Sequence, residues 1–152
     1  MLLSGFYLLG EFVMRDKTGV RWLRVIIAGL LSEILIILVI VGAIMIYKYG
    51  VTPLGEQLDV FSAKVGFYVG IAGSAAACFL LAWWAGRVLK SDFIVNGLLV
   101  GVFAILWQLG LTLSAGAKFE TIYLLAYALK LAGGALGGLV ARRRFTQTAI
   151  MS

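Results

Sequence analysis

Two ionisable side chains, Glu33 and Lys130, lie inside long apolar stretches of the sequence. Glu33 follows Arg24 by nine residues and Lys130 precedes Arg142 by twelve. Helices that rise about 1.5 Å per residue place them roughly 13 Å and roughly 18 Å beyond those arginines, well inside a bilayer. A lone charge at that depth costs about 3 kcal/mol or more, and an opposite charge offsets the cost. We therefore predict an ion pair between Glu33 and Lys130 that joins two membrane-spanning helices.

Other roles for these side chains stay open. Lys130 could extend toward an interface, leaving Glu33 to protonate or to line a water-filled path as a proton or cation site. Gln108 and Thr112 share one helix face, and Gln108 could extend such a path or bond a neighbouring helix. The four intramembrane polar residues thus support a structural hypothesis and a transport hypothesis.

The composition excludes most enzyme chemistry. Histidine is absent and Cys78 is the single cysteine, which removes the usual haem and zinc ligands, internal disulfides and histidine-based acid–base catalysis. No phosphate-cradling loop is recognisable, because the glycines lie within an apolar run. We predict a protein that is not an enzyme and has no cofactor and no metal. Nucleic acid is not an expected partner, because the basic residues do not form a continuous stripe.

The elements that position these side chains are four apolar runs at residues 25–47, 63–88, 93–117 and 121–141. The chain of 152 residues is 62% hydrophobic and 13% charged, so lipid is its expected solvent. Each run is long enough to cross a hydrocarbon core as a helix, which takes about 20 residues. We predict an all-α polytopic membrane protein, a four-transmembrane-helix bundle in one membrane domain over residues 1–152.

Two flanking segments complete this interpretation. Residues 1–14 are too short to span a membrane, and Leu2, Phe6, Leu9 and Val13 recur at helical spacing. This pattern predicts an amphipathic helix in the membrane interface, with a loosely ordered terminus or a partner-docking helix as alternatives. A further short helix is predicted to begin at Pro53, to rest on the membrane surface and to lead into the second span.

Small residues recur at four-residue spacing in several of the runs. In lipid, helices associate through close backbone approach, which small residues permit. They could pack one bundle internally or form a contact between subunits. The predicted helix-packing residues are Gly29, Gly66, Gly70, Gly73, Gly97, Gly101, Gly133, Gly134, Gly137 and Gly138.

The charge distribution predicts the orientation. Of the 13 Lys and Arg residues, nine fall on one side of the four runs, three (Lys48, Lys64 and Lys118) fall on the other, and Lys130 lies within. An excess of Lys and Arg marks cytoplasmic segments, so both termini are expected in the cytoplasm of a cell carrying this protein in its inner or plasma membrane. The predicted interface anchors are Trp22, Arg24, Trp83, Trp84, Arg87, Arg142, Arg143 and Arg144.

These observations leave two function classes. Short loops, glycine-rich helices and the absence of a catalytic motif favour a structural or accessory subunit that packs against itself or a larger membrane complex. The alternative is an oligomeric channel or transporter for an ion, a proton or a small solute, using Glu33 and Lys130. The expected partners are the lipid bilayer and either further copies of the chain or another membrane protein.

Overall fold

The computed structural model describes residues 20–51, 55–87, 92–116 and 121–151, and it describes side chains as far as residue 144. Every element in this part of the chain is helical: α2 (Trp22–Val51), α3 (Gly55–Tyr68), the π-helical segment η1 (Val69–Gly73), α4 (Ser74–Gly86), α5 (Phe93–Ser114) and α6 (Ile122–Met151). The interfacial helix predicted for residues 1–14 lies outside the described residues.

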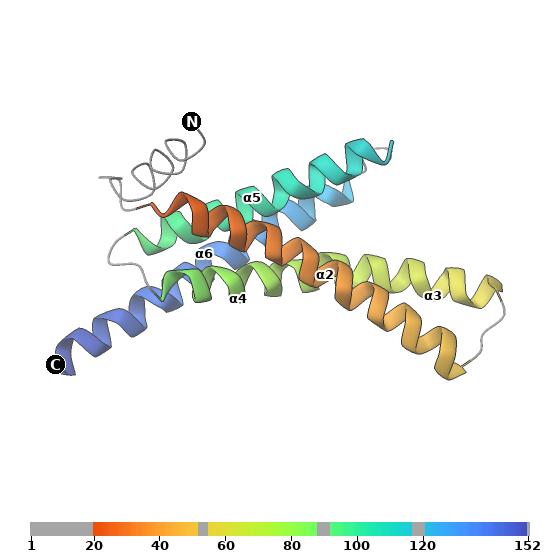
Figure 1. The fold of residues 1–152 in the computed structure, drawn as a ribbon, viewed down its shortest axis with the longest axis horizontal. Helices are drawn as coiled ribbons and strands as arrows, with labels where there is room; N and C mark the ends of the chain where they lie inside the picture. Colours follow the sequence, from red (N-terminus) through yellow and green to blue (C-terminus); the bar gives the residue numbers. More distant parts are fainter. Residues whose placement is uncertain (1–19, 52–54, 88–91, 117–120, 152) are drawn as a thin grey trace, which may run out of the picture.

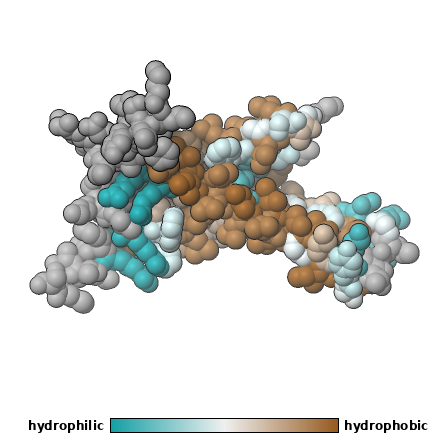
Figure 2. Space-filling view, viewed as in Figure 1, coloured by the Kyte–Doolittle hydropathy of each residue, from teal (hydrophilic) through white to brown (hydrophobic). Residues whose placement is uncertain are grey.

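Four helical stretches in the described residues are long and apolar enough to cross a membrane: Trp22–Val51, Gly55–Gly86, Phe93–Ser114 and Ile122–Arg144. For the described residues, the expectation of an all-helical protein with four such helices is therefore confirmed. Figure 2 shows a hydrophobic belt across the middle of the molecule, with hydrophilic residues toward its two ends. This distribution suits a protein whose middle lies in hydrocarbon and whose ends reach the interfaces.

The boundaries of the helices differ from the predicted spans at several ends, and two of the differences are the largest. The helix beginning at Gly55 continues through η1 into α4 without a break, so the short helix expected to lead into the second span is one helix with it, while Pro53 lies outside the described residues. Residues 55–86 contain no proline, and the helix departs from α-helical geometry at the π-helical segment η1. The last helix continues past Ala141 to Met151, because the arginines that follow are good helix formers.

The four long helices converge at one end of the molecule and diverge at the other (Figure 1). We name the first the basic end, which holds the start of α2, the end of α4, the start of α5 and residues Ala141–Arg144. The other, which holds Val51, Gly55, Ser114 and Ile122, is the open end. The helix α6 packs along both α4 and α5, and α2 packs across α4 and α5. Toward the open end, α2 and α3 separate from α5 and α6 (Figure 1).

Glycines on α6 make its two close contacts possible. A methyl group added at Gly134 would overlap the carbonyl of Gly97 on α5, and one added at Gly133 would overlap the carbonyl of Ala75 on α4. One turn further on, Gly138 and Gly137 face α5 and α4 in the same way. Gly134 and Gly138 therefore face α5, whereas Gly133 and Gly137 face α4, and α6 packs between these two helices at backbone contact distance.

Other predicted packing glycines divide between close contact and open space. Gly29 faces Phe103 and Ala104 of α5, Gly101 faces the backbone of α6, and Gly73 faces Ile36. Gly66 and Gly70 are different, because a methyl group added at either would meet nothing within 4 Å. Within the described residues they do not pack against another helix, and a contact between subunits at these two glycines stays a prediction.

Candidate functional site

Lys130 and Glu33 form a buried ion pair between α6 and α2. The Nζ atom of Lys130 donates to Oε1 of Glu33 over 2.5 Å, and the two side chains are 1% and 9% exposed. Lys130 is thus as fully enclosed as any apolar core residue, although it carries a charge. Such burial is tolerated when the partner charge is adjacent and the other donors find acceptors. The sequence-based pairing of these two residues corresponds to the geometry found here.

Gln108 on α5 supplies a second acceptor to the same lysine. Its Oε1 atom accepts a hydrogen bond from Lys130 Nζ over 2.7 Å. Three helices therefore meet at one ammonium group, and we name Glu33, Gln108 and Lys130 the lysine cluster. An ammonium group only donates hydrogen bonds, so the atoms that face it must be acceptors, here the Oε1 atoms of Glu33 and Gln108.

Glycines near the lysine cluster explain why its three members meet. Gly29 lies one turn before Glu33 on α2 and contacts α5, with an added Cβ 2.7 Å from Phe103 Cβ. Gly101 lies two turns before Gln108 on α5, and its added Cβ would be 2.9 Å from the carbonyl oxygen of Lys130. Residues spaced by four and seven share a helix face, so each close contact aims a polar side chain at the same point.

Thr112, the fourth residue of the predicted polar set, is not brought into the cluster. It lies one turn beyond Gln108 and is partly exposed. In the described part of the chain, the side chains hydrogen-bonded to Lys130 are those of Glu33 and Gln108. The polar set therefore divides into three residues that meet and one that does not.

Two small residues lie beside the lysine cluster and were not predicted as site residues. Ser32 is buried and its Oγ donates to the carbonyl of Gly29 over 2.7 Å. Cys78 on α4 lies against it, with Sγ 3.8 Å from Ser32 Oγ, and is 0% exposed. Cys78 thus occupies a core position, as a small buried side chain does, and the hydroxyl of Ser32 is satisfied by its own helix.

A second polar contact, also unpredicted, ties the helices at the basic end. Asn96 is buried on α5, and its Oδ1 accepts from the backbone N–H of Arg21 over 3.1 Å. Its Nδ2 donates to the carbonyl of Asp92 over 2.9 Å. Asp92 adopts a left-handed conformation with φ 55°, which begins α5 sharply. The spacing of Asp92 and Asn96 was a signal for a local contact, but nothing in the sequence indicated Arg21 as the partner.

The predicted interface anchors gather at the basic end. The guanidinium groups of Arg87 and Arg144 lie 4.2 Å and 5.1 Å from the ring centroid of Trp83. Trp22 meets Phe103 edge-on at 6.5 Å, and Trp84 is exposed. Arg24 is half-buried, while Arg142 and Arg143 are exposed. Cations stacked on indole rings at the end of an apolar belt are typical of a membrane interface.

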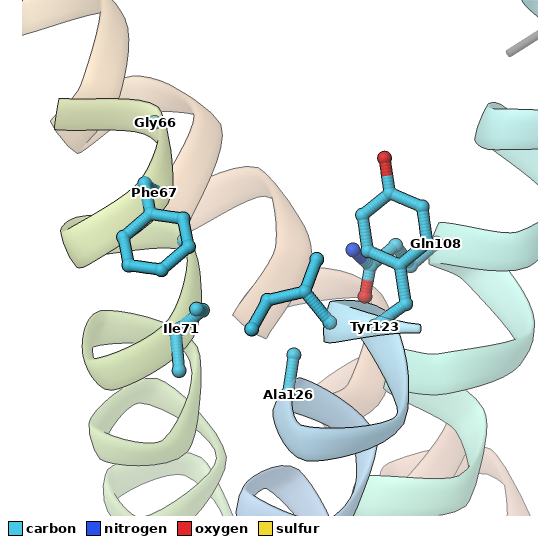
Figure 3. Close-up of a pocket in the computed structure, with 8 residues that line it drawn as sticks. Gly66, Phe67, Ile71, Gln108, Tyr123 and Ala126 are labelled. Atoms are coloured by element: carbon cyan, nitrogen blue, oxygen red, sulfur yellow. The ribbon is translucent and has the colours of Figure 1, made fainter. Parts of the chain in front are cut away.

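A pocket of about 260 Å³ lies beside the lysine cluster, toward the open end. Its lining comes from both separated pairs of helices, and Figure 3 shows Phe67 and Ile71 on one side with Tyr123 and Gln108 on the other. Gln108 therefore belongs both to the pocket wall and to the lysine cluster. The lining residues are Gly66, Phe67, Gly70, Ile71, Gln108, Ile122, Tyr123 and Ala126.

The chemistry available at this site is binding and charge compensation. The carboxylate of Glu33 accepts a hydrogen bond from the ammonium group of Lys130. In the residues that the structure describes, no group of three or more His, Cys, Asp or Glu side chains could hold a metal ion. Comparison with known proteins found no matching family model, curated protein or solved structure.

Proposed function

We propose that this chain is a non-enzymatic integral membrane protein that acts as a structural or accessory subunit, packing against itself or a larger membrane complex. The observation that carries the proposal is the uncovered part of the molecule toward the open end. We name α2 residues 37–51 together with α3 the projecting arm. The buried residues of α2 end at Ile36, and α3 has none.

The projecting arm has the properties of a preformed contact unit. Its two helices are joined by the stacked rings of Tyr47 and Phe61, whose centroids are 3.9 Å apart. Large apolar side chains cover its surface, including Leu38 at 63% and Ile46 at 76% exposure. Because its helices are already held together, a partner does not have to order them on binding, which lowers the cost of association. Lipid could also cover this apolar surface, but the accessory role that we propose requires a second protein to bind it.

Cysteine crosslinking in native membranes tests the accessory role. In a Cys78→Ala background, Leu38→Cys and Ile46→Cys place single thiols on the projecting arm, while Leu136→Cys places a thiol on α6 at a position that is also more than half exposed. We expect the arm variants to form crosslinked dimers, or adducts with another membrane protein identified by mass spectrometry. The Leu136→Cys variant should form neither. Equal crosslinking at the arm and at Leu136 would contradict the proposal.

The proposed orientation places the basic end in the cytoplasm of the inner or plasma membrane. Support comes from the basic residues that lie together at that end: Arg21, Arg24, Arg87 and the run Arg142–Arg144. The contacts between Gly86 and Ala141 and between Arg21 and Asn96 bring the helix ends that carry them together. A cysteine at Arg143 labelled by a membrane-impermeant reagent in intact cells would contradict this orientation. A cysteine at Tyr49, which is exposed near the open end, should be labelled.

A second candidate function, conduction or transport, is favoured by the pocket that reaches Gln108. A polar connection runs from this pocket through Gln108 to Lys130 and Glu33. Intramembrane ionisable groups next to a cavity are the usual components of ion and proton pathways. A proton or potassium flux assay in liposomes tests this function, with Glu33→Gln compared with the parent at equal incorporation. Flux that depends on Glu33 would support conduction or transport in place of the accessory role. The absence of flux would rule out conduction or transport of these ions.

A further inference from the structure

We infer that the pocket between the separated helices binds an elongated, lipid-soluble molecule through one neutral carbonyl oxygen. The first step concerns shape. The pocket volume of about 260 Å³ lies just below the range of about 300 Å³ upward that small-molecule sites occupy. It is partly open, so it suits a segment of a longer molecule, the rest of which extends into the surrounding hydrocarbon.

The second step concerns polarity. The pocket walls are apolar at Phe67, Ile71, Ile122 and Ala126, and two glycines add no side chain. Such walls favour a hydrocarbon segment over a hydrated solute, because a polar solute would lose its hydrogen bonds to water without replacing them. Gln108 is the wall residue tied to the lysine cluster, so it supplies a hydrogen-bonding group that is held in place, and Tyr123 is the other polar residue of the wall.

The third step concerns which group Gln108 presents. Its Oε1 atom is committed to Lys130, because an ammonium group can only donate and must face the amide oxygen. The amide therefore offers its N–H donors elsewhere, and Figure 3 shows its nitrogen on the side facing the pocket. Gln108 is half-buried, and a bound molecule with an acceptor oxygen at this point can accept from its amide. Such a molecule gains a hydrogen bond that a plain hydrocarbon cannot make, so it binds better.

The fourth step concerns charge. Glu33 neutralises Lys130 at 2.5 Å, so the wall behind Gln108 carries no net charge. A carboxylate entering the pocket would lose hydration without gaining an uncompensated cation. A neutral carbonyl, as in an ester or a quinone, loses far less. The chemistry shared by the expected ligands is one uncharged carbonyl on an apolar chain. This site does not depend on the accessory role of the projecting arm.

Photolabelling tests the inference on the full chain purified in mild detergent. The probe is a fatty acid methyl ester carrying a diazirine group near the ester, and the labelled residues are mapped by mass spectrometry. We expect labelling at the peptides that contain Phe67, Ile71 or Ile122. Methyl palmitate should compete at least tenfold better than palmitate at pH 9 or hexadecane. Equal competition by all three would overturn the role of the carbonyl.

Two substitutions with matched controls complete the test. Gln108→Leu removes the donor and should reduce labelling about tenfold, while Gln57→Leu makes the same chemical change at an exposed position of α3 and should leave it unchanged. Gly70→Leu fills the pocket where nothing lies within 4 Å and should abolish labelling, while Gly42→Leu is equally unhindered outside the pocket. If Gln108→Leu does not fold, Gly70→Leu decides the question, because Gly70 is not part of the lysine cluster.

Native mass spectrometry of the purified protein distinguishes the two possible sources of the carbonyl group, a bilayer phospholipid and a free carbonyl compound. A phospholipid retained by the parent and released by Gly70→Leu identifies a bilayer ester as the ligand. Probe binding without a retained phospholipid identifies a free carbonyl compound. Labelling that is the same in the parent, Gln108→Leu and Gly70→Leu would show adventitious contact with amphiphile and would overturn the inference. Failure of arm crosslinking would leave this result unaffected, so the two proposals fail separately.

Discussion

The two ends of this molecule use the same residue type in opposite ways. Toward the basic end, an added methyl group at Gly97, Gly134 or Gly138 would overlap the backbone of the facing helix. Toward the open end, an added methyl group at Gly66 or Gly70 would meet nothing within 4 Å. The glycines of the first group hold helices at backbone contact, and those of the second leave a pocket. The spacing of glycines in the sequence therefore does not tell which of them pack, because packing depends on whether another helix faces the glycine.

The lysine cluster lies at the boundary between these two regions. Glu33 lies one turn before Ile36, the last buried residue of α2, and Lys130 follows one turn after Ala126, the first buried residue of α6. Beyond this level the helices separate. A charge pair at that position joins the helices where close glycine contacts end, so it stabilises the packed region at its edge.

The largest expected effect comes from breaking the ion pair. Lys130→Met or Glu33→Ala leaves one charge buried without its partner, and we expect each to lower the free energy of unfolding by about 3–5 kcal/mol. Unfolding of the protein in bicelles by increasing the fraction of denaturing detergent measures this change. The double variant Glu33→Leu with Lys130→Met removes both charges and should lose less than either single variant. If both single variants unfold like the parent, the lysine cluster does not stabilise the boundary.

The second effect tests the packed region. Gly134→Ala places a methyl group against the carbonyl of Gly97, and neither backbone can move without disturbing its helix. We expect a loss of about 1–3 kcal/mol, as for overpacked cores. Gly110→Ala is the matched control, because an added methyl group on this α5 glycine meets nothing within 4 Å. Equal stability of the two variants in the same bicelle assay would show that α5 and α6 are not in backbone contact.

A smaller loss is expected at the basic end. Asn96→Leu removes the acceptor of the Arg21 backbone N–H and the donor to Asp92. Loss of these hydrogen bonds from a buried position should lower the stability by roughly 1 kcal/mol. Amide hydrogen exchange at Arg21 should accelerate in this variant while exchange at Gly134 stays unchanged. Unchanged exchange at both positions would indicate that Asn96 does not hold the start of α2.

Much of this architecture could be predicted from composition and depth. Runs of about 20 apolar residues require helices in lipid, so four spans followed from the sequence. The partner of Lys130 also followed, because Glu33 is an acid inside the membrane whose depth differs from that of Lys130 by about one helical turn, which two long side chains can span. The contribution of Gln108 was open, since its position allowed it either to extend a polar path or to bond a neighbouring helix. Helix rotation and the close approach at Gly101 bring it to Lys130, and neither is encoded in local spacing.

Other features depend on contacts between distant residues. The continuity of α3, η1 and α4 did not follow from the sequence, because Pro53 indicates where a short helix begins and no residue type indicates whether that helix continues into the second span. The division of the α6 glycines between α4 and α5 requires knowing which helices flank α6. The pocket depends on helices that separate, and a separation leaves no periodic signal in the sequence.

The smallest expected effect is a gain in stability in the open region. In Gly66→Ala or Gly70→Ala the added methyl group meets no neighbour within 4 Å, and alanine restricts the unfolded chain and favours the helix by about 0.5–1 kcal/mol relative to glycine. Each variant should therefore unfold at a higher fraction of denaturing detergent than the parent, and the two gains should add. Gly42→Ala on α2 serves as the control for an uncovered glycine away from the pocket and should show a similar gain. A loss at Gly66 or Gly70 with a gain at Gly42 would mean that a partner or a ligand approaches these two glycines closely, and the open region would then be an occupied interface.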